Sequence, residues 1–295
     1  MTATTQPRPA APQARHHAES VTLAPADFEY LRHMLKAHAG IVIDPAKAYL
    51  AEHRLAPLAR QHGCASLPDF LHLLQSQAFG AVHREAVAAM ANNETWFFRD
   101  SAPFTALSQH VLPRLLKNRS GDRPLSLWSA ACSTGQEPYS IAMLLRESHV
   151  PARQLSILAT DLCEASLARA TGALYRQMEV NRGLPSPLLT RYFIQRGLLW
   201  QLKPEITAMV SFRQLNLASA WPPLPPLDIV FLRNVLIYFD SETRRQVLAR
   251  VHRALCPEGV LFLGSAETPY DLADAFEPLE AGNYTCYQPR KQALP

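Results

Sequence analysis

The sequence has no long hydrophobic run and few charged residues of either sign. Of its 295 residues, 48% are hydrophobic and 18% are charged, yet no stretch approaches the roughly 18 uncharged apolar residues that a membrane-spanning helix needs. The formal net charge of +4 permits an acidic partner but is too small to demand nucleic acid. We therefore expect a soluble protein without membrane insertion, long enough for one ordinary domain and a smaller one.

Paired cysteines and metal-binding histidine motifs are also absent. The five cysteines stand singly, an odd number without a C-x-x-C pair, so neither a disulfide framework nor a zinc site is indicated. None of the eleven histidines falls in H-E-x-x-H or another ligand spacing. These absences predict a cytoplasmic protein with reduced thiols and no bound metal.

The first part of the chain combines an irregular start with a helical pattern. Residues 1–21 are rich in Ala, Pro, Thr and Gln and lack the apolar core of a secretory signal, which predicts a disordered tail. In residues 22–90 apolar side chains recur every three to four positions, as in amphipathic helices. Asp44 and Pro45 suit the start of the second helix. Pro57 falls inside that helix, where it should kink or interrupt the hydrogen-bond ladder.

From residue 105 to 290 short apolar runs alternate with helical stretches, which is typical of an α/β domain with a mostly parallel sheet. The expected strands are Leu125 to Ser129, Leu155 to Thr160, Ile229 to Leu232 and Val260 to Leu263. The expected helices are Glu137 to Arg146, Ala165 to Thr171 and Ser241 to Leu255, the last capped by Asp240 or Ser241 and ended by a Pro257-Glu258-Gly259 turn. At about 178–209 the alternation stops, which predicts a small strand-rich insertion.

Ligands of such sheets bind beyond the carboxyl ends of the strands, and two loops there carry suggestive residues. The loop from Ser129 to Ser140 contains small residues and Gly135, which admit a close ligand, and Glu137 opens the next helix. It has one glycine, not the three of a dinucleotide fingerprint, so packing alone explains it equally well. Asp161 lies near the spacing at which an acid reaches ribose hydroxyls, although an isolated Asp there is often a helix cap.

A third loop and a linker add further candidates. Asn234 and Tyr238 follow a buried strand and can face a shared cleft, or they are a turn residue and a half-buried aromatic. The linker, residues 91–104, contains Asn93-Glu-Thr-Trp-Phe-Phe-Arg99, in which the arginine is able to bind a carboxylate. Its aromatic residues are better explained as packing between the two parts of the chain.

Taken together, these strings resemble the CheR family of chemotaxis-receptor methyltransferases from about Phe28 to Tyr287. The matching strings, in the family's order and spacing, are Asn93-Glu-Thr-Trp-Phe-Phe-Arg99, Trp128-Ser-Ala-Ala-Cys-Ser-Thr-Gly-Gln-Glu-Pro-Tyr-Ser140, Ala159-Thr-Asp161, Arg233-Asn-Val-Leu-Ile-Tyr-Phe-Asp240 and Gly259-Val-Leu-Phe-Leu-Gly264. The resemblance implies a Rossmann-like class I methyltransferase domain that depends on S-adenosylmethionine. It also implies an N-terminal helical domain and a small inserted β-subdomain.

The activity implied by the resemblance is that of a protein-glutamate O-methyltransferase, which converts S-adenosylmethionine to S-adenosylhomocysteine. The implied partner is the cytoplasmic helical region of chemoreceptors, whose methylation sets adaptation. The implied cofactor contacts are Asn93, Thr95, Arg99, Glu137, Asp161, Asn216, Leu217, Asn234 and Val235. Asp161 would anchor the ribose, Glu137 the methionine end and Asn216-Leu217 the adenine. Arg99 and Tyr238 would contact the acceptor carboxylate.

Receptor docking is implied through a basic helix that carries Lys47, Arg54 and Arg60. Pro57 and Leu58 occupy positions that are arginine in some relatives, so this helix departs from the pattern. The segment from Phe193 to Trp200 lacks the glycine-rich loop of relatives that bind a receptor's C-terminal peptide. We therefore expect an enzyme that works without this tether, and a monomer is the simplest state.

Two other functions fit parts of the pattern. A nucleic-acid methyltransferase would share the sheet and the cofactor, but its usual motifs are missing, because Val235 follows Asn234 and Pro257 follows Cys256. A non-catalytic S-adenosylmethionine-binding regulator of a chemosensory or biofilm pathway is the second alternative. Every implied cofactor position is filled, which argues against lost binding.

Overall fold

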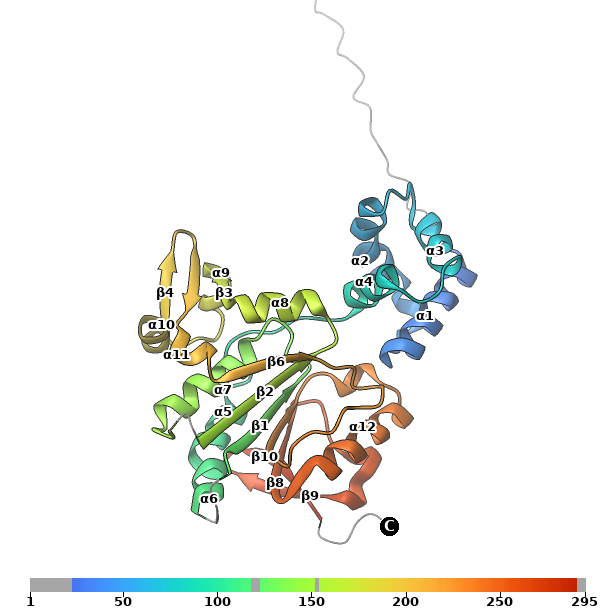
Figure 1. Cartoon of the computed structure of the whole chain (residues 1–295). Helices are drawn as coiled ribbons and strands as arrows, with labels where there is room; N and C mark the ends of the chain where they lie inside the picture. The colour runs from blue at the N-terminus through green and yellow to red at the C-terminus, as the bar shows by residue number, and fades with distance from the viewer. Residues whose placement is uncertain (1–22, 118–122, 152–153, 291–295) are drawn as a thin grey trace, which may run out of the picture.

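The first part of the chain is a bundle of helices with a hydrophobic core of its own. The computed structural model describes residues 23–117, 123–151 and 154–290, so the predicted tail at 1–21 lies outside the described residues. The helical bundle comprises α1 (Pro25–Ala39), the 3-10 turn η1 (Pro45–Lys47), α2 (Ala48–Gln61), α3 (Leu67–Gln75) and α4 (Ala81–Met90). Its core includes the fully buried Leu31, Leu35 and Leu55. Figure 1 shows the bundle, in blue to blue-green, to one side of the larger body that carries the main sheet.

The start of the second helix agrees with the sequence, and Pro57 interrupts one hydrogen bond of the ladder without ending the helix. The Asp44 side chain accepts a hydrogen bond from the Ala46 amide at 2.8 Å and so caps η1, which leads into α2. Helix α2 then continues through Pro57 to Gln61 without a break. Proline has no backbone N–H, so the helical hydrogen bond from residue 57 to the His53 carbonyl is missing. His53 is exposed, and water can donate to its carbonyl instead. Packing of Leu55 and its neighbours in the bundle core outweighs that local loss.

The second part of the chain is built on a seven-stranded sheet, the large sheet, in the order β6-β2-β1-β7-β8-β10-β9. Its strands are β1 (Leu125–Ala130), β2 (Leu155–Asp161), β6 (Val210–Gln214), β7 (Leu227–Leu232), β8 (Leu255–Leu263), β9 (Phe276–Ala281) and β10 (Tyr284–Pro289). The first five strands of this order are parallel, and β10 runs antiparallel to β8 and β9. Every residue of the central strands β1 and β7 is buried, as expected for a sheet covered on both faces. The four predicted strands and the mostly parallel sheet are confirmed.

The helices of the second part are α5 (Ala102–Ala106), the π-helical η2 (Leu107–Val111), α6 (Leu112–Lys117), α7 (Gln136–Glu147), α8 (Glu164–Gly172), the 3-10 turn η4 (Leu236–Tyr238), α12 (Ser241–Ala254) and the 3-10 segment η5 (Tyr270–Ala275). The three helices expected here are confirmed, and Asp240 caps α12 by accepting from the Thr243 amide at 2.9 Å. The predicted turn at Pro257 to Gly259 is wrong as a helix end, because α12 stops at Ala254 and β8 has already begun. Those residues belong to β8 at an irregularity, where its register with β7 shifts.

The predicted insertion contains a second, three-stranded antiparallel sheet in the order β3-β5-β4, the small sheet. Its elements are β3 (Leu174–Arg176), α9 (Gln177–Asn181), α10 (Ser186–Tyr192), β4 (Phe193–Arg196), β5 (Leu199–Leu202) and α11 (Pro204–Thr207). The insertion therefore begins earlier than predicted and is as much helical as strand-rich. The strand β3 spans three residues and is recognisable only from its pairing with β5. In the described parts of the chain, no helix combines the length and apolarity that crossing a bilayer requires.

The helical bundle meets the second part along a short segment after α1. The Val42 amide donates to the Tyr238 carbonyl at 2.8 Å, and Lys36 Nζ lies 2.8 Å from Asp240 Oδ2. Gly40 makes this approach possible. It has a φ of +71°, and a Cβ atom added there would lie 2.8 Å from the Cβ of Ala218, closer than van der Waals contact allows.

We expect Gly40→Ala to destabilise the protein more than Gly63→Ala. Both glycines have a left-handed backbone, with φ of +71° and +73°, but a Cβ at Gly63 meets nothing within 4 Å. Each substitution should cost about 1–2 kcal/mol of unfolding free energy for its backbone conformation. Only Gly40→Ala adds a clash between the bundle and the second part. Thermal unfolding of the two variants measures the difference, and equal losses would contradict a close contact at Gly40.

Candidate functional site

A pocket lies where the carboxyl ends of β1, β2, β6 and β7 face the linker and the end of α1. Its empty volume is about 970 Å³, including open solvent at its mouth. The residues predicted from the sequence to contact the cofactor or the acceptor all line it: Asn93, Thr95, Arg99, Glu137, Asp161, Asn216, Leu217, Asn234, Val235 and Tyr238. The fold thus brings together residues that lie far apart along the chain.

The loop after β1 has an unusual backbone that joins the ends of two strands. Ala131, Ser133 and Gly135 all have positive φ, at 55°, 49° and 92°. The turn aims the Ser133 amide at Asp161 Oδ2, at a distance of 2.8 Å. A Cβ atom on Gly135 would lie 2.9 Å from the Cβ of Ala170, so glycine is needed there. Left-handed non-glycine residues cost free energy and tend to cluster at binding sites.

Asp161 is a buried acceptor at the end of β2. Besides Ser133, its carboxylate accepts the Cys163 amide at 2.9 Å, and the residue is only 7% exposed. Burial raises the pKa of Asp161 above the ordinary aspartate value, although amide donors oppose that shift. Each carboxylate oxygen keeps a further lone pair. The side chain can therefore accept hydrogen bonds from a diol such as that of a ribose.

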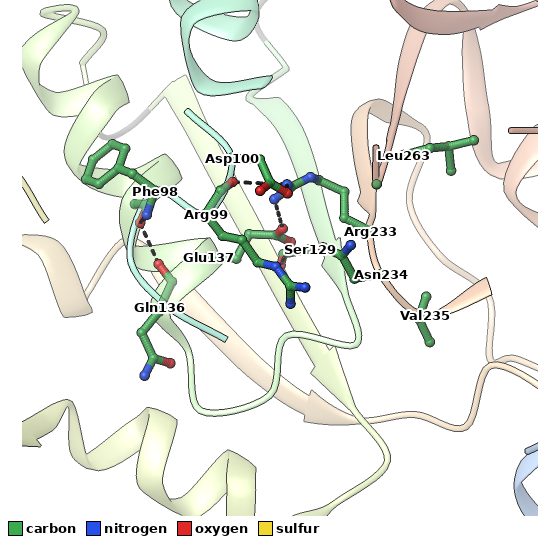
Figure 2. Close-up of polar contacts among 12 residues, drawn as sticks. Phe98, Arg99, Asp100, Ser129, Gln136, Glu137, Arg233, Asn234, Val235 and Leu263 are labelled. Atoms are coloured by element: carbon green, nitrogen blue, oxygen red, sulfur yellow. Dashed lines mark hydrogen bonds and ion pairs between the residues drawn. The ribbon is translucent and has the colours of Figure 1, made fainter. Parts of the chain in front are cut away.

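A buried ionic network, the Arg233 network, forms part of the pocket wall and ties the linker to the sheet (Figure 2). The Arg233 guanidinium, 1% exposed, lies 2.9 Å from Glu137 and 2.9 Å from Asp100. It also donates to the Arg99 carbonyl at 3.0 Å. The second carboxylate oxygen of Glu137 accepts from the Ser129 hydroxyl at 2.8 Å. Glu137 therefore reaches the pocket with its charge balanced by Arg233 and its orientation fixed.

Arg99 stands at the pocket with its guanidinium over the Trp96 ring, 4.4 Å from the ring centroid. Arg182 lies over the same indole at 3.9 Å. Arg99 also donates to the Glu94 carbonyl at 2.8 Å. Its Nε is buried and has no hydrogen-bond partner among the described residues. Such stacking fixes the plane of the guanidinium, which suits it to a planar carboxylate.

The aromatic residues beside Arg99 pack within the second part of the chain, not between its two parts as predicted. Phe97 is fully buried, and its ring centroid lies 5.0 Å from that of Tyr175 and 5.7 Å from that of Phe193. Both partners belong to the small sheet. Phe98 packs against Phe104. The linker is thereby held between the large and small sheets.

The remaining pocket residues lie on the loops after β6 and β7. Asn216 Nδ2 donates to the His38 carbonyl at 2.6 Å, a contact with α1. Leu217 is 6% exposed and belongs to an apolar cluster. Asn234 has a left-handed φ of 59°. The Tyr238 hydroxyl lies 2.6 Å from Asn92 Nδ2, so the linker also contacts the loop after β7.

The predicted docking residues differ in how freely their charges are presented. Lys47 and Arg60 are exposed, and among the described residues their side chains make no hydrogen bond or ion pair. Arg54 instead donates to the Met90 carbonyl at 2.6 Å and is partly buried. Leu58 packs into the bundle core.

The composition of the pocket fits a nucleoside that carries an amino-acid group. Asp161 supplies a buried acceptor, while Leu162, Leu215 and Leu217 supply an apolar wall. The Arg99 guanidinium at the pocket adds a donor group. Across the described ranges, no group of three or more His, Cys, Asp or Glu residues is placed to hold a metal ion.

Two residues of the site were not assigned a role from the sequence. Arg233 stands directly after a buried strand and next to Asn234, a position that hinted at a structural charge. Glu267 accepts backbone amides from the loop after β7. Nothing in its local sequence indicated this role, because its partners lie about thirty residues away.

Comparisons with known proteins agree with this geometry. Residues 93–285 match the family model described as the CheR methyltransferase SAM binding domain, and residues 26–91 match the CheR methyltransferase all-alpha domain. The chain is 41% identical to chemotaxis protein methyltransferase 1 of Pseudomonas aeruginosa over 274 residues, which cover 91% of this chain and 99% of that protein. It is 39% identical to chemotaxis protein methyltransferase Cher2 of Pseudomonas putida over 268 residues, covering 89% and 97% of the two chains.

Proposed function

This chain belongs to the CheR methyltransferase family, and we propose that it methylates glutamate side chains in the cytoplasmic helical region of chemoreceptors. S-adenosylmethionine is its cofactor. The observation that carries the proposal is the convergence of all the expected cofactor and acceptor residues on one pocket. The reaction is that of a protein-glutamate O-methyltransferase, and its proposed role is to set receptor adaptation.

The proposed cofactor contacts follow from what each side chain offers. Asp161 holds the ribose hydroxyls with the lone pairs that its amide donors leave free. Glu137, oriented by Arg233, faces the positively charged amino group of the methionine end. Asn216 and Leu217 flank the adenine.

The chemistry asks the protein mainly for positioning. Bound S-adenosylmethionine supplies a methyl group on a sulfonium centre. The acceptor glutamate is already ionised near neutral pH, so no base is needed to activate it. Arg99 would orient the acceptor carboxylate, and Tyr238 would make a second contact with it.

The proposed docking surface is formed by Lys47, Arg54 and Arg60, with the two exposed cations carrying most of the attraction to acidic receptor helices. We expect the double variant Lys47→Glu, Arg60→Glu to raise the KM for receptor about tenfold at low salt. Its kcat and cofactor affinity should not change. Initial rates at several receptor and salt concentrations measure this effect.

Lys117→Glu is the control for that prediction. It reverses an exposed charge on α6, far from the bundle in Figure 1. A comparable rise in KM for Lys117→Glu would show that only the net charge matters. An unchanged KM in the double variant would remove this surface from the docking site.

Further parts of the proposal concern organisation. We propose a helical domain at 22–90, a linker at 91–104 that contributes to the cofactor site, and a methyltransferase domain at 105–290. We also propose a cytoplasmic monomer that needs no receptor tail peptide. Calorimetric binding of such a peptide would contradict the last point.

The direct test uses methyl-labelled S-adenosylmethionine and cytoplasmic fragments of chemoreceptors from the same organism. Label that enters the receptor and is released by mild alkali would support carboxyl methyl esters. Tight cofactor binding without any labelling would favour a non-catalytic regulator.

A further inference from the structure

The carboxylate of Glu267 gathers an unusual number of backbone donors beside the pocket. Its Oε2 accepts the amides of Gly264 at 2.7 Å and Asn234 at 2.6 Å. Its Oε1 accepts the amides of Val235 and Leu236, both at 2.8 Å, and lies 3.4 Å from the amide of Ile237. Glu267 is 7% exposed, and no basic side chain among the described residues pairs with it.

These donors belong to the loop that forms one wall of the pocket. Four of the five amides are consecutive, from Asn234 to Ile237. Asn234 is held at a φ of 59°, and the 3-10 turn that follows ends at Tyr238. Successive backbone amides that point to one side form a concave site for an anion. If no group of the chain occupied this site, water or another anion would bind there. Glu267 fills that site from within the chain.

The surroundings leave little room for any other arrangement. A Cβ atom on Gly264 would lie 2.6 Å from Glu267 Oε2 and 2.7 Å from Asn234 Nδ2. The Glu267 amide also donates to the Gly264 carbonyl at 2.9 Å, which closes a tight turn after β8. The carboxylate is therefore held at a fixed place relative to β7 and β8.

We propose that Glu267 is a positioning residue for methyl transfer, fixing the loop from Asn234 to Tyr238 so that its cofactor side and its acceptor side are aligned at once. The inference rests on the proposed function and adds to it a residue that contacts neither substrate. Asn234 and Val235 line the cofactor side, and Tyr238 lies on the acceptor side. If this loop relaxes, both cofactor binding and the position of the acceptor are therefore disturbed.

The test compares Glu267→Gln with Asp228→Asn. Glutamine keeps the shape but places an NH2 group against several amide donors, so the loop should loosen. Asp228 is equally buried, at 7% exposure, and accepts from the Ser126 amide and from Arg123 near the other end of β7. Each variant removes one buried carboxylate charge. Glu267 lies beside the pocket, whereas Asp228 does not.

We expect Glu267→Gln to lower kcat/KM for receptor methylation about 100-fold and to weaken S-adenosylhomocysteine binding about tenfold. Hydrogen exchange in the cofactor-free protein should speed up at the amides of 234–237 and remain slow in β8. Asp228→Asn should lower the melting temperature without changing the kinetic constants or the exchange of that loop. Glu267→Asp, which keeps the charge but shortens the reach, should give intermediate losses.

The proposal is overturned if Glu267→Gln melts at a lower temperature but keeps normal kcat/KM, normal S-adenosylhomocysteine affinity and a protected loop. It is also overturned if Asp228→Asn produces the same kinetic losses. If Glu267→Gln does not fold, Glu267→Asp provides the same comparison. Absence of methyl transfer by the unaltered protein would contradict the proposed function instead, while the exchange measurement would still judge the role of Glu267.

Discussion

Arg99→Ala is expected to reduce methyl transfer to receptor about 100- to 1,000-fold, the range for removing a preorganised charged donor from an active site. The side chain stacks on Trp96 and donates only to a backbone carbonyl, so few structural contacts depend on it. The contact that ties this position to Arg233 uses the Arg99 carbonyl, which the substitution keeps. Single-turnover rates beside thermal unfolding separate loss of function from loss of fold.

Arg182→Ala is the matched control for Arg99→Ala. It removes the other guanidinium stacked on Trp96, which is half exposed, paired with Glu94 and not part of the pocket lining. We expect a small effect on turnover. If Arg99→Ala lost stability and activity in equal measure, or if both arginine variants lost the same activity, Arg99 would have no special role toward the acceptor.

Asp161→Asn is expected to weaken binding of S-adenosylmethionine and S-adenosylhomocysteine about 100-fold, because hydrogen bonds to a charged acceptor contribute about 1.5–3 kcal/mol each. Some stability should also be lost, because the side-chain NH2 of Asn must face one of the two backbone amides that donate to Asp161, although removal of a buried charge offsets part of that loss. Burial raises the pKa of Asp161, so the ionised form is less favourable in the folded than in the unfolded chain, and the neutral amide avoids this cost. Calorimetric titration with S-adenosylhomocysteine, together with a melting curve, measures both quantities.

The raised pKa also predicts a pH dependence for cofactor binding. Protonation of Asp161 begins at a higher pH than for an ordinary aspartate, and it replaces an acceptor lone pair by a proton. Cofactor affinity should therefore weaken as the pH falls, whereas this protonation does not destabilise the cofactor-free protein. Asp161→Asn should lose that dependence. An Asn variant with full affinity, or one that titrates like the unaltered protein, would contradict the ribose contact.

The sequence predicted the central strands and the pocket lining for a clear physical reason. Strands buried on both faces are mostly apolar, so β1, β2, β7 and β8 stand out as short runs rich in hydrophobic residues. Polar residues directly after such runs have to lie at one edge of a parallel sheet. Asp161 and Asn234 were recognisable in this way, and the family resemblance supplied Asn216 and Leu217.

Features that depend on partners far along the chain were not predictable in the same way. The strand β6 alternates partly exposed and exposed residues and is identified by its pairing with β2. Pro57 reads as a helix breaker unless the bundle core that supports α2 is known. Glu267 looks like an ordinary surface acid in the sequence, and only the folded loop from Asn234 to Ile237 gives it a role. Tertiary contacts, not local preference, decide each of these cases.

Peptide mapping of a receptor fragment after incubation with S-adenosylmethionine tests the central claim most directly. We predict a mass increase of one methyl group on particular glutamates of the receptor's helical region, removed by mild alkali and strongly reduced at equal incubation time with Asp161→Asn or Arg99→Ala. A methyl group that resists alkali, or one found on a side chain other than a carboxylate, would contradict the account even if the protein binds the cofactor tightly.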